Sequence, residues 1–133
     1  MANAIYTAAK TAMMTGGLNL LADTIRVALV DGAEYVFNAG HTSLADVPPA
    51  ARVAVATLTG KSVTAGVFDA NDAIFVAASG AQSECLILYR DSGNEATSTL
   101  IGYIDTGSGL PVTPTGFDLI VVWPNDDNKI IKL

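Results

Sequence analysis

The feature that most constrains this fold is a series of short apolar runs, about ten residues apart, that alternate with turn-forming clusters. Runs rich in β-branched and aromatic residues predict strands, whereas clusters of Gly, Asp, Asn and Pro predict turns. The expected strands are 24–30, 52–58, 74–77, 85–89, 99–104 and 119–123, with shorter ones at 35–37, at 62–63 joined to 66–69 as one bent or bulged strand, and at 129–133. About seven to nine short strands at this spacing predict a mainly β fold, either an antiparallel β-sandwich or a jelly-roll-like barrel.

Residues 85–89 are the strongest strand in the series. Their sequence, Cys-Leu-Ile-Leu-Tyr, is almost continuously apolar, which is typical of a strand that is buried on both faces of a sheet. We therefore expect it at the centre of the sheet, with 99–104 as its antiparallel neighbour.

A short helix is expected at the N-terminus, over residues 3–14. Asn3 is a suitable N-cap, alanines raise the helix propensity, and Gly16 with Gly17 ends the helix. Its apolar face consists of Ile5, Ala9, Ala12 and Met13. Because a helix of about three turns is unstable alone, it must dock, either on the chain's own sheet or on a neighbouring subunit.

Composition places the chain among soluble, folded domains with few charges. The 133 residues are enough for a single domain, 1–133, with a sizeable core. Charged residues make up 15% and hydrophobic residues 50%, with a mean hydropathy of +0.41, which excludes a disordered chain. The 21 alanines explain part of this hydropathy, and a surface covered by a partner or by further copies would explain the rest.

Charge and hydropathy patterning also exclude several kinds of partner. Seven Lys and Arg face thirteen Asp and Glu, a net charge of −6, which argues against nucleic acid. The longest apolar runs, such as 119–123, are far too short to span a membrane. The first residues lack the basic start of a signal peptide. We therefore expect a soluble protein, made in the cytoplasm, with no membrane or nucleic-acid partner.

The only cysteine and the only histidine are the first candidates for catalysis. A nucleophilic Cys85 would have to be a partly exposed thiolate beside a base such as His41. Cys85 instead begins an apolar strand, where a free cysteine acts as a small buried hydrophobe. We expect a structural cysteine and no enzyme activity.

Two acidic clusters are the candidates for a cation site. Asp69 and Asp72 flank Asn71, and Asp126 with Asp127 lies between two asparagines. Neither segment has the spacing of a calcium-binding EF-hand loop, and Asp and Asn also stabilise turns through their own backbone. Turns are the favoured interpretation, with cation binding as the alternative, so neither metal nor cofactor is expected.

Two glycine motifs and the aromatic residues complete the search for chemistry. The G-x-G at 107–109 lacks the third glycine and the following helix of a dinucleotide site, and the G-K-S at 60–62 lacks the upstream glycine of a phosphate loop. Most aromatic residues lie within strand patterns and are expected in the core. Trp123 and Tyr103 are the best candidates for exposed exceptions, because each has a polar atom suited to a rim.

Several segments together resemble a family of small virion proteins of tailed bacteriophages. They are 1–6 with the Ala-rich stretch that follows, 23–31, 46–48, 58–61, 66–70, 109–114, Trp123 and 129–133. The resemblance covers nearly the whole chain, and its motifs are structural. It implies a virion component without enzyme activity, plausibly a capsid decoration (cement) protein on the capsid exterior.

A cement protein needs a rigid scaffold with apolar contact surfaces, which agrees with the composition. Its expected partners are the major capsid protein and copies of itself, in a dimer or trimer that bridges subunits at a symmetry axis. The expected contact residues are Ile5, Tyr6, Met13, Pro48, Pro49, Ile130 and Leu133. Two alternatives stay open: a tail, head-spike or fibre-base component that binds a host surface, and a small enzyme or sugar-binding module.

Overall fold

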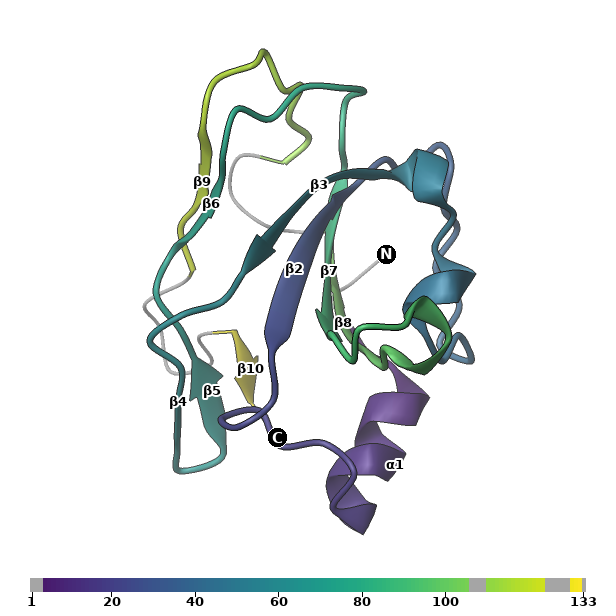
Figure 1. Cartoon of the computed structure of the whole chain (residues 1–133), viewed down its shortest axis with the longest axis vertical. Coiled ribbons are helices and arrows are strands. Elements are labelled where there is room, and N and C mark those ends of the chain that lie inside the picture. The colour runs from purple at the N-terminus through teal and green to yellow at the C-terminus, as the bar shows by residue number, and fades with distance from the viewer. Residues whose placement is uncertain (1–3, 106–109, 124–129, 133) are drawn as a thin grey trace.

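The structure, a computed structural model, describes residues 4–105, 110–123 and 130–132 (Figure 1). The strands are β1 (Ala4–Ile5), β2 (Ile25–Val30), β3 (Arg52–Thr57), β4 (Ser62–Thr64), β5 (Val67–Asp69), β6 (Ala73–Phe75), β7 (Cys85–Arg90), β8 (Leu100–Ile104), β9 (Leu119–Val121) and β10 (Ile131–Lys132). The helical segments are α1 (Thr7–Thr15) and the 3-10 turns Leu44–Asp46, Pro49–Ala51 and Glu95–Thr97. All strand pairs within the sheets are antiparallel. The expected mainly β, antiparallel class with one short α-helix is therefore confirmed for the described residues.

The largest sheet has five strands in the order β1-β8-β7-β2-β3. The apolar strand β7 occupies its centre, as the sequence predicts, and β8 is its antiparallel neighbour. On its other side β7 pairs with β2, where Val27 lies opposite Leu88. Residues from distant parts of the chain thus converge on one central strand.

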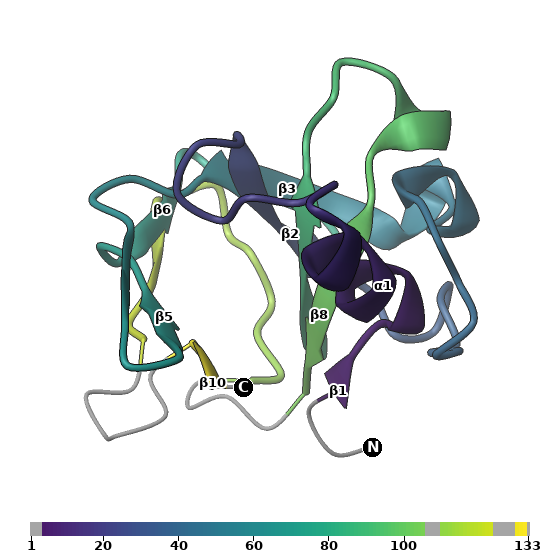
Figure 2. The same ribbon diagram turned by 90° about the horizontal axis from the view of Figure 1, so that it is seen from below.

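Two smaller sheets cover one face of the five-stranded sheet. One has the order β10-β5-β4, and the other pairs β6 with β9. Figure 2 shows them on one side of β2, β3 and β8, opposite the segment that connects β2 to β3. Among the described residues no sheet closes into a barrel, since each strand order has two ends.

The three central strands of the five-stranded sheet, β8, β7 and β2, are buried on both faces because their side chains alternate between two cores. One core combines odd-numbered residues of β2 with Leu86 and Leu88 of β7, and it faces the smaller sheets. The smaller sheets and their flanks contribute Phe68, Phe75, Trp123 and Ile131. The period of two that defines a strand therefore assigns every second side chain to this layer.

The second core lies on the opposite face of the same strands. It contains Ala28 and Val30 of β2 and Ile87 of β7. The connecting segments cover these residues with Tyr6, Tyr35, Leu44, Val47 and Ala51. This arrangement explains why 85–89 is apolar at every position.

The N-terminal helix is shorter than the predicted 3–14. Asn3 lies outside the described residues, and Ala4–Ile5 is a strand that pairs with β8, so α1 begins only at Thr7. Its end is as predicted, because Gly16 adopts a left-handed φ of 79°. Ala9 is fully buried in the first core, so the helix docks on its own chain. None of the described helices is long and apolar enough to cross a membrane.

Two predicted strands are wrong in detail. Residues 35–37 form a loop, because Tyr35 and Phe37 serve the second core through their side chains while their backbone joins no sheet. Residues 62–69 form a hairpin of two paired strands, β4 and β5, where one bent strand was expected. Ala65 and Gly66 make its turn with positive φ at both positions, the geometry of a type I′ turn.

Candidate interaction surface

The outer side of the β6–β9 sheet is apolar and exposed. Ile74 of β6 lies directly opposite Ile120 of β9, and Val76 and Val122 each follow one residue after these strands. The exposed fractions are 49% for Ile74, 63% for Ile120, 76% for Val76 and 70% for Val122. We call these four side chains the β6–β9 face.

Strand alternation produces this face. Ala73 and Phe75 point into the first core and are buried, so the residue between them points outward. On β9, Leu119 and Val121 pack against the same core on either side of Ile120. The inward residues alone attach the two strands, so folding does not require the outward ones to be apolar.

Trp123 anchors this sheet on the body of the protein, and a second contact joins the flanks of its two strands. The Trp123 indole N–H donates to the Asn71 carbonyl at 3.0 Å, and the ring is buried in the first core. The Ala77 amide donates to the Asp118 carboxylate at 2.7 Å. The face is therefore a firmly supported surface rather than a loose hairpin.

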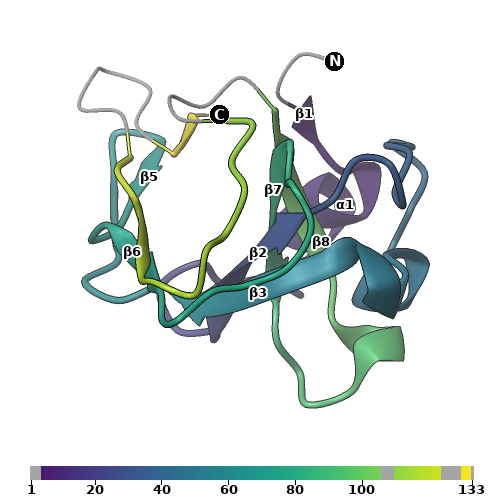
Figure 3. The same ribbon diagram turned by 90° about the horizontal axis from the view of Figure 1, so that it is seen from above.

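An exposed aromatic side chain lies shortly before β9 in the sequence. The Phe117 side chain is 77% exposed, and its carbonyl accepts a hydrogen bond from the Ala78 amide, two residues after Val76, at 3.2 Å. Single exposed apolar side chains are ordinary, but a contiguous group of them marks an interaction site. Figure 1 and Figure 3 show β6 and β9 side by side, on the part of the molecule remote from α1.

Acidic side chains flank the face. Continuing the β6–β9 register places Asp72 opposite Val122 and Asp118 opposite Val76. Asp72 accepts a hydrogen bond from the Trp123 amide at 3.1 Å. Both carboxylates are exposed, so they present negative charge at two corners of the face.

The described arginines, and Lys61, have partners elsewhere in the fold. Arg26 pairs with Asp91 at 2.9 Å and Arg52 with Glu95 at 2.7 Å. Arg90 donates to the Gly17 carbonyl at 2.7 Å, and Lys61 donates to the Asp23 carbonyl. None of these contacts involves the acidic corners of the β6–β9 face.

The contact residues expected from the sequence do not form one surface. Tyr6 is fully buried in the second core, so its aromatic ring packs inside the protein. Met13 is half-buried against the first core. Pro48 and Pro49 are exposed, at the start of a 3-10 turn. Leu133 lies outside the described residues.

Among the described members of that set, Ile5 and Ile130 come together. Both line a hollow of about 610 Å³ beside β1, along with Phe37, Tyr103 and Lys10. Both are also packed against the first core, so their apolar character is explained by folding.

Cys85 is a structural residue, as the sequence predicts. Its side chain is fully buried, and its Sγ lies 3.6 Å from the Val30 carbonyl. Burial raises the pKa of the thiol to about 11, although a hydrogen bond with Tyr103 acts in the opposite direction. A thiol with such a pKa stays protonated at neutral pH and is a poor nucleophile.

His41 belongs to a chain of hydrogen bonds that serves the same core. The Tyr6 and Tyr35 hydroxyls lie 2.8 Å apart, and the Tyr35 hydroxyl lies 2.8 Å from Nδ1 of His41. Burial, followed by the hydrogen bond between the Tyr6 and Tyr35 hydroxyls, raises the pKa of the Tyr6 phenol. His41 thus satisfies the hydroxyl of the buried Tyr35 through Nδ1, which is a structural role in this core.

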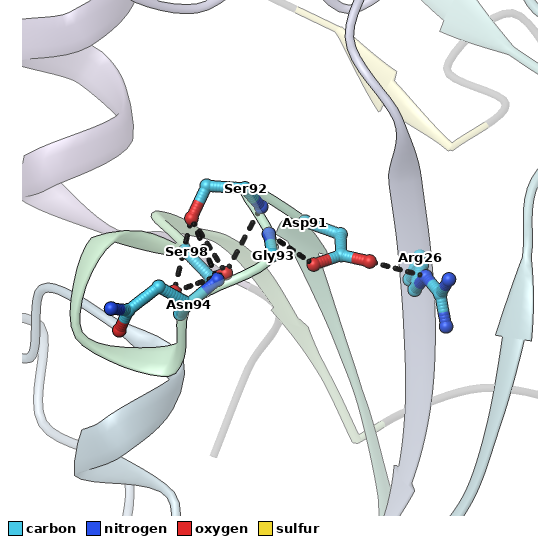
Figure 4. Close-up of polar contacts among 6 residues, drawn as sticks. All are labelled: Arg26, Asp91, Ser92, Gly93, Asn94 and Ser98. Atoms are coloured by element: carbon cyan, nitrogen blue, oxygen red, sulfur yellow. Dashed lines mark hydrogen bonds and ion pairs between the residues drawn. The ribbon is translucent and has the colours of Figure 1, made fainter.

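A second cluster of polar contacts lies in the loop between β7 and β8 (Figure 4). Asp91 pairs with Arg26 and accepts from the Gly93 amide at 2.9 Å. The hydroxyls of Ser92 and Ser98 both donate to the Asn94 carbonyl, at 3.0 and 2.8 Å. Because each contact closes the loop on itself or ties it to β2, the cluster is explained as turn stabilisation.

The structure describes one of the two acidic clusters, Asp69 to Asp72, and not the other. In the described part of the chain, no three His, Cys, Asp or Glu side chains gather as a metal site would require. Asp72 accepts from the Trp123 amide, so its carboxylate links the flanks of β6 and β9. Asp126 and Asp127 lie outside the described residues, as does the G-x-G at 107–109. Gly60 occupies a turn with a φ of 61° that leads into β4, and no helix follows it.

The aromatic prediction is wrong for the two exceptions it named. Trp123 and Tyr103 are buried, whereas Phe117 is the aromatic side chain among the large exposed hydrophobic residues. Sequence reasoning also missed the β6–β9 face. The signal was present in the continuous apolar runs around Ile74 and Ile120, because a continuous run produces two apolar faces and a two-stranded surface sheet buries only one.

Comparison with known proteins leaves the chain without an assigned family. No family model matches its sequence, and no curated protein matches it either.

Proposed function

We propose that this chain is a non-enzymatic capsid decoration protein of a tailed bacteriophage. It binds the outer surface of the capsid and bridges neighbouring major capsid subunits. The observation that carries the proposal is the β6–β9 face, a supported apolar surface that the fold itself does not use. The resemblance to small virion proteins indicates where such a surface would find its partner.

The geometry suits an adhesive role. A cement protein acts through contact area, and each copy contributes modest binding energy that a shell of many copies sums. Exposed apolar side chains on a rigid sheet bind with little loss of conformational entropy. Copies joined in a dimer or trimer would place several such faces around a symmetry axis and so contact several capsid subunits at once.

We also propose how the three sheets are arranged as layers. We infer a sandwich in which the five-stranded sheet packs against the two smaller sheets, with jelly-roll-like crossing of the chain between them. The first core supports this arrangement, because it joins Val27 and Leu88 of the main sheet to Phe68 and Phe75 of the smaller ones.

The second candidate is a tail, head-spike or fibre-base component that binds a host surface. The observation in its favour is Phe117, because an exposed aromatic ring is a surface on which a sugar ring can stack. Host-surface binding would then use Phe117, whereas capsid binding would use the aliphatic residues of the β6–β9 face.

The copy number of the chain in purified particles of the source phage tests the proposal. Quantitative mass spectrometry against the major capsid protein is expected to give hundreds of copies per particle. A handful of copies would overturn decoration in favour of a tail, spike or vertex component. Absence from the particle would overturn both candidates.

A further inference from the structure

We infer that the β6–β9 face is the capsid-binding surface, and that its counterpart on the capsid protein is an apolar patch flanked by Lys or Arg side chains. This inference rests on the proposed function and adds to it the contacting residues and the chemistry of the partner. Two observations on the described residues carry it: an aliphatic centre that is exposed, and acidic residues beside it that have no printed cation partner among the described side chains.

The centre of the face has the character of an interface core. Ile74 and Ile120 are cross-strand partners, so their side chains are close enough to be covered together by one partner residue. Val76 and Val122 extend the apolar surface along both strands. Interface centres are depleted of charge and enriched in apolar residues, as this group of four is.

The two carboxylates beside the face, Asp72 and Asp118, indicate that the partner is positively charged at these positions. Asp72 and Asp118 each accept one hydrogen bond from a backbone amide, from Trp123 and Ala77 respectively. A carboxylate has room for several donors, so each can also accept from a cation on the partner. Among the described residues, the arginines and Lys61 are bound at other places in the fold, and Lys10 lines the hollow beside β1, so a cation for these carboxylates is expected on the partner.

The same charges disfavour a second copy of the chain as the occupant. Two β6–β9 faces packed against each other would enclose four carboxylates. None of the described arginines is placed to neutralise them, and an enclosed charge without a partner is costly. A basic counterpart removes this cost and also accelerates association with a chain whose net charge is −6.

The experiment compares the full-length chain with two exposed-valine variants. Val122→Asp places a charge inside the β6–β9 face, and Val36→Asp places the same charge on an 82% exposed residue elsewhere. Binding is measured by co-sedimentation with source-phage capsids that lack the chain. Val122→Asp is expected to weaken binding by roughly tenfold or more, while Val36→Asp binds as the unmodified chain does. Equal melting temperatures of the two variants establish that both are folded.

A second variant tests the charge of the partner. The double substitution D72N/D118N keeps a carbonyl oxygen for each backbone amide and removes both charges. It is expected to weaken capsid binding and to reduce the dependence of binding on salt concentration. If the face instead binds a second copy, the same variant will self-associate more strongly in sedimentation equilibrium while its capsid binding stays unchanged.

The outcomes separate this inference from the function on which it rests. If the unmodified chain binds capsids and Val122→Asp binds equally well, the face is wrong and the decoration role stands. If the unmodified chain does not bind capsids at all, the decoration role is wrong and this inference falls with it.

Discussion

The central strand β7 of the five-stranded sheet and the strands β6 and β9 of the small sheet all contain continuous apolar runs, but the fold covers them differently. In β7 both the odd and the even side chains are buried, because packed segments cover both faces of the main sheet. In β6 and β9 only the inward residues are covered, and Ile74 and Ile120 face outward. The apolar outward residues of β6 and β9 therefore need an explanation other than folding, which is the basis for proposing an interaction there.

The largest expected difference between these regions comes from one substitution made in both. Ile87→Ala removes a fully buried side chain from β7, and the cavity is expected to lower the free energy of unfolding by about 2–5 kcal/mol. Ile120→Ala shortens an exposed side chain and is expected to change the free energy of unfolding by less than about 0.5 kcal/mol. Chemical denaturation measures both values. Similar losses for the two variants would contradict an open β6–β9 face.

The melting temperature at alkaline pH tests the burial of the second core, which lies on one face of the main sheet. Burial raises the pKa of the Cys85 thiol from its ordinary 9.0 to about 11, and it raises the pKa of the Tyr6 and Tyr103 phenols above their ordinary 10.0. Groups with a raised pKa in the folded protein stabilise it fully below the ordinary pKa, and this contribution is lost as the pH rises through the folded value. The melting temperature is therefore expected to fall above about pH 9.

The control for this prediction removes the group that titrates first. Cys85→Ala eliminates the thiol, so the decline between pH 9 and about 11 is expected to become shallower, while the part due to the tyrosines remains. A melting temperature that stays level up to pH 11 would mean that the second core admits water to these groups.

The main sheet was predictable from the sequence, and the contrast with the smaller sheets explains why. Strand β7 and its pairing with β8 follow from local patterns, because a strand covered on both faces has an unmistakable composition. The 3-10 turn Leu44–Asp46 also has a local cause, since the Asp46 carboxylate accepts from the Ser43 amide in a capping arrangement. Signals within a few residues of each other can be interpreted without knowing the rest of the fold.

Features that depend on distant partners were not predictable in this way. Ala4–Ile5 becomes a strand only because β8 offers it an edge, and the same two residues fit a helix equally well by composition. Tyr35 has strand propensity, but its hydroxyl is held between Tyr6 and His41 while its backbone runs in a loop. The exposed face was missed for the same reason, since no local pattern says which side of a strand will be covered.

Gly60 connects the two regions, and its substitution is expected to affect the smaller sheets. Its φ of 61° is unfavourable for other residues, and a Cβ there would clash with the side-chain amide of Asn71. Gly60→Ala is expected to cost about 1–2 kcal/mol of unfolding free energy. It should also disturb the Asn71 carbonyl contact that anchors Trp123, so the fluorescence of this single tryptophan is expected to shift to longer wavelength.

Gly93 supplies the matched control for Gly60. It has a φ of 87° with open space around the position of a Cβ, in the loop beside the main sheet. Gly93→Ala should therefore show a similar conformational cost while the Trp123 fluorescence stays unchanged. A fluorescence shift in both variants would indicate general loosening instead of a local anchor at the β6–β9 sheet.

The smallest expected effect is a gain in stability, confined to the β4–β5 hairpin. Ala65 adopts a φ of 53° in the two-residue turn that it forms with Gly66, and Asn-Gly is the preferred sequence for such a turn. Ala65→Asn is expected to add about 0.5–1 kcal/mol to the free energy of unfolding. Amide hydrogen exchange should show slower exchange in β4 and β5, where the turn sets the local opening. If protection rises equally in β7, the hairpin and the main sheet open together, and the smaller sheets are more tightly coupled to the core than their exposed face indicates.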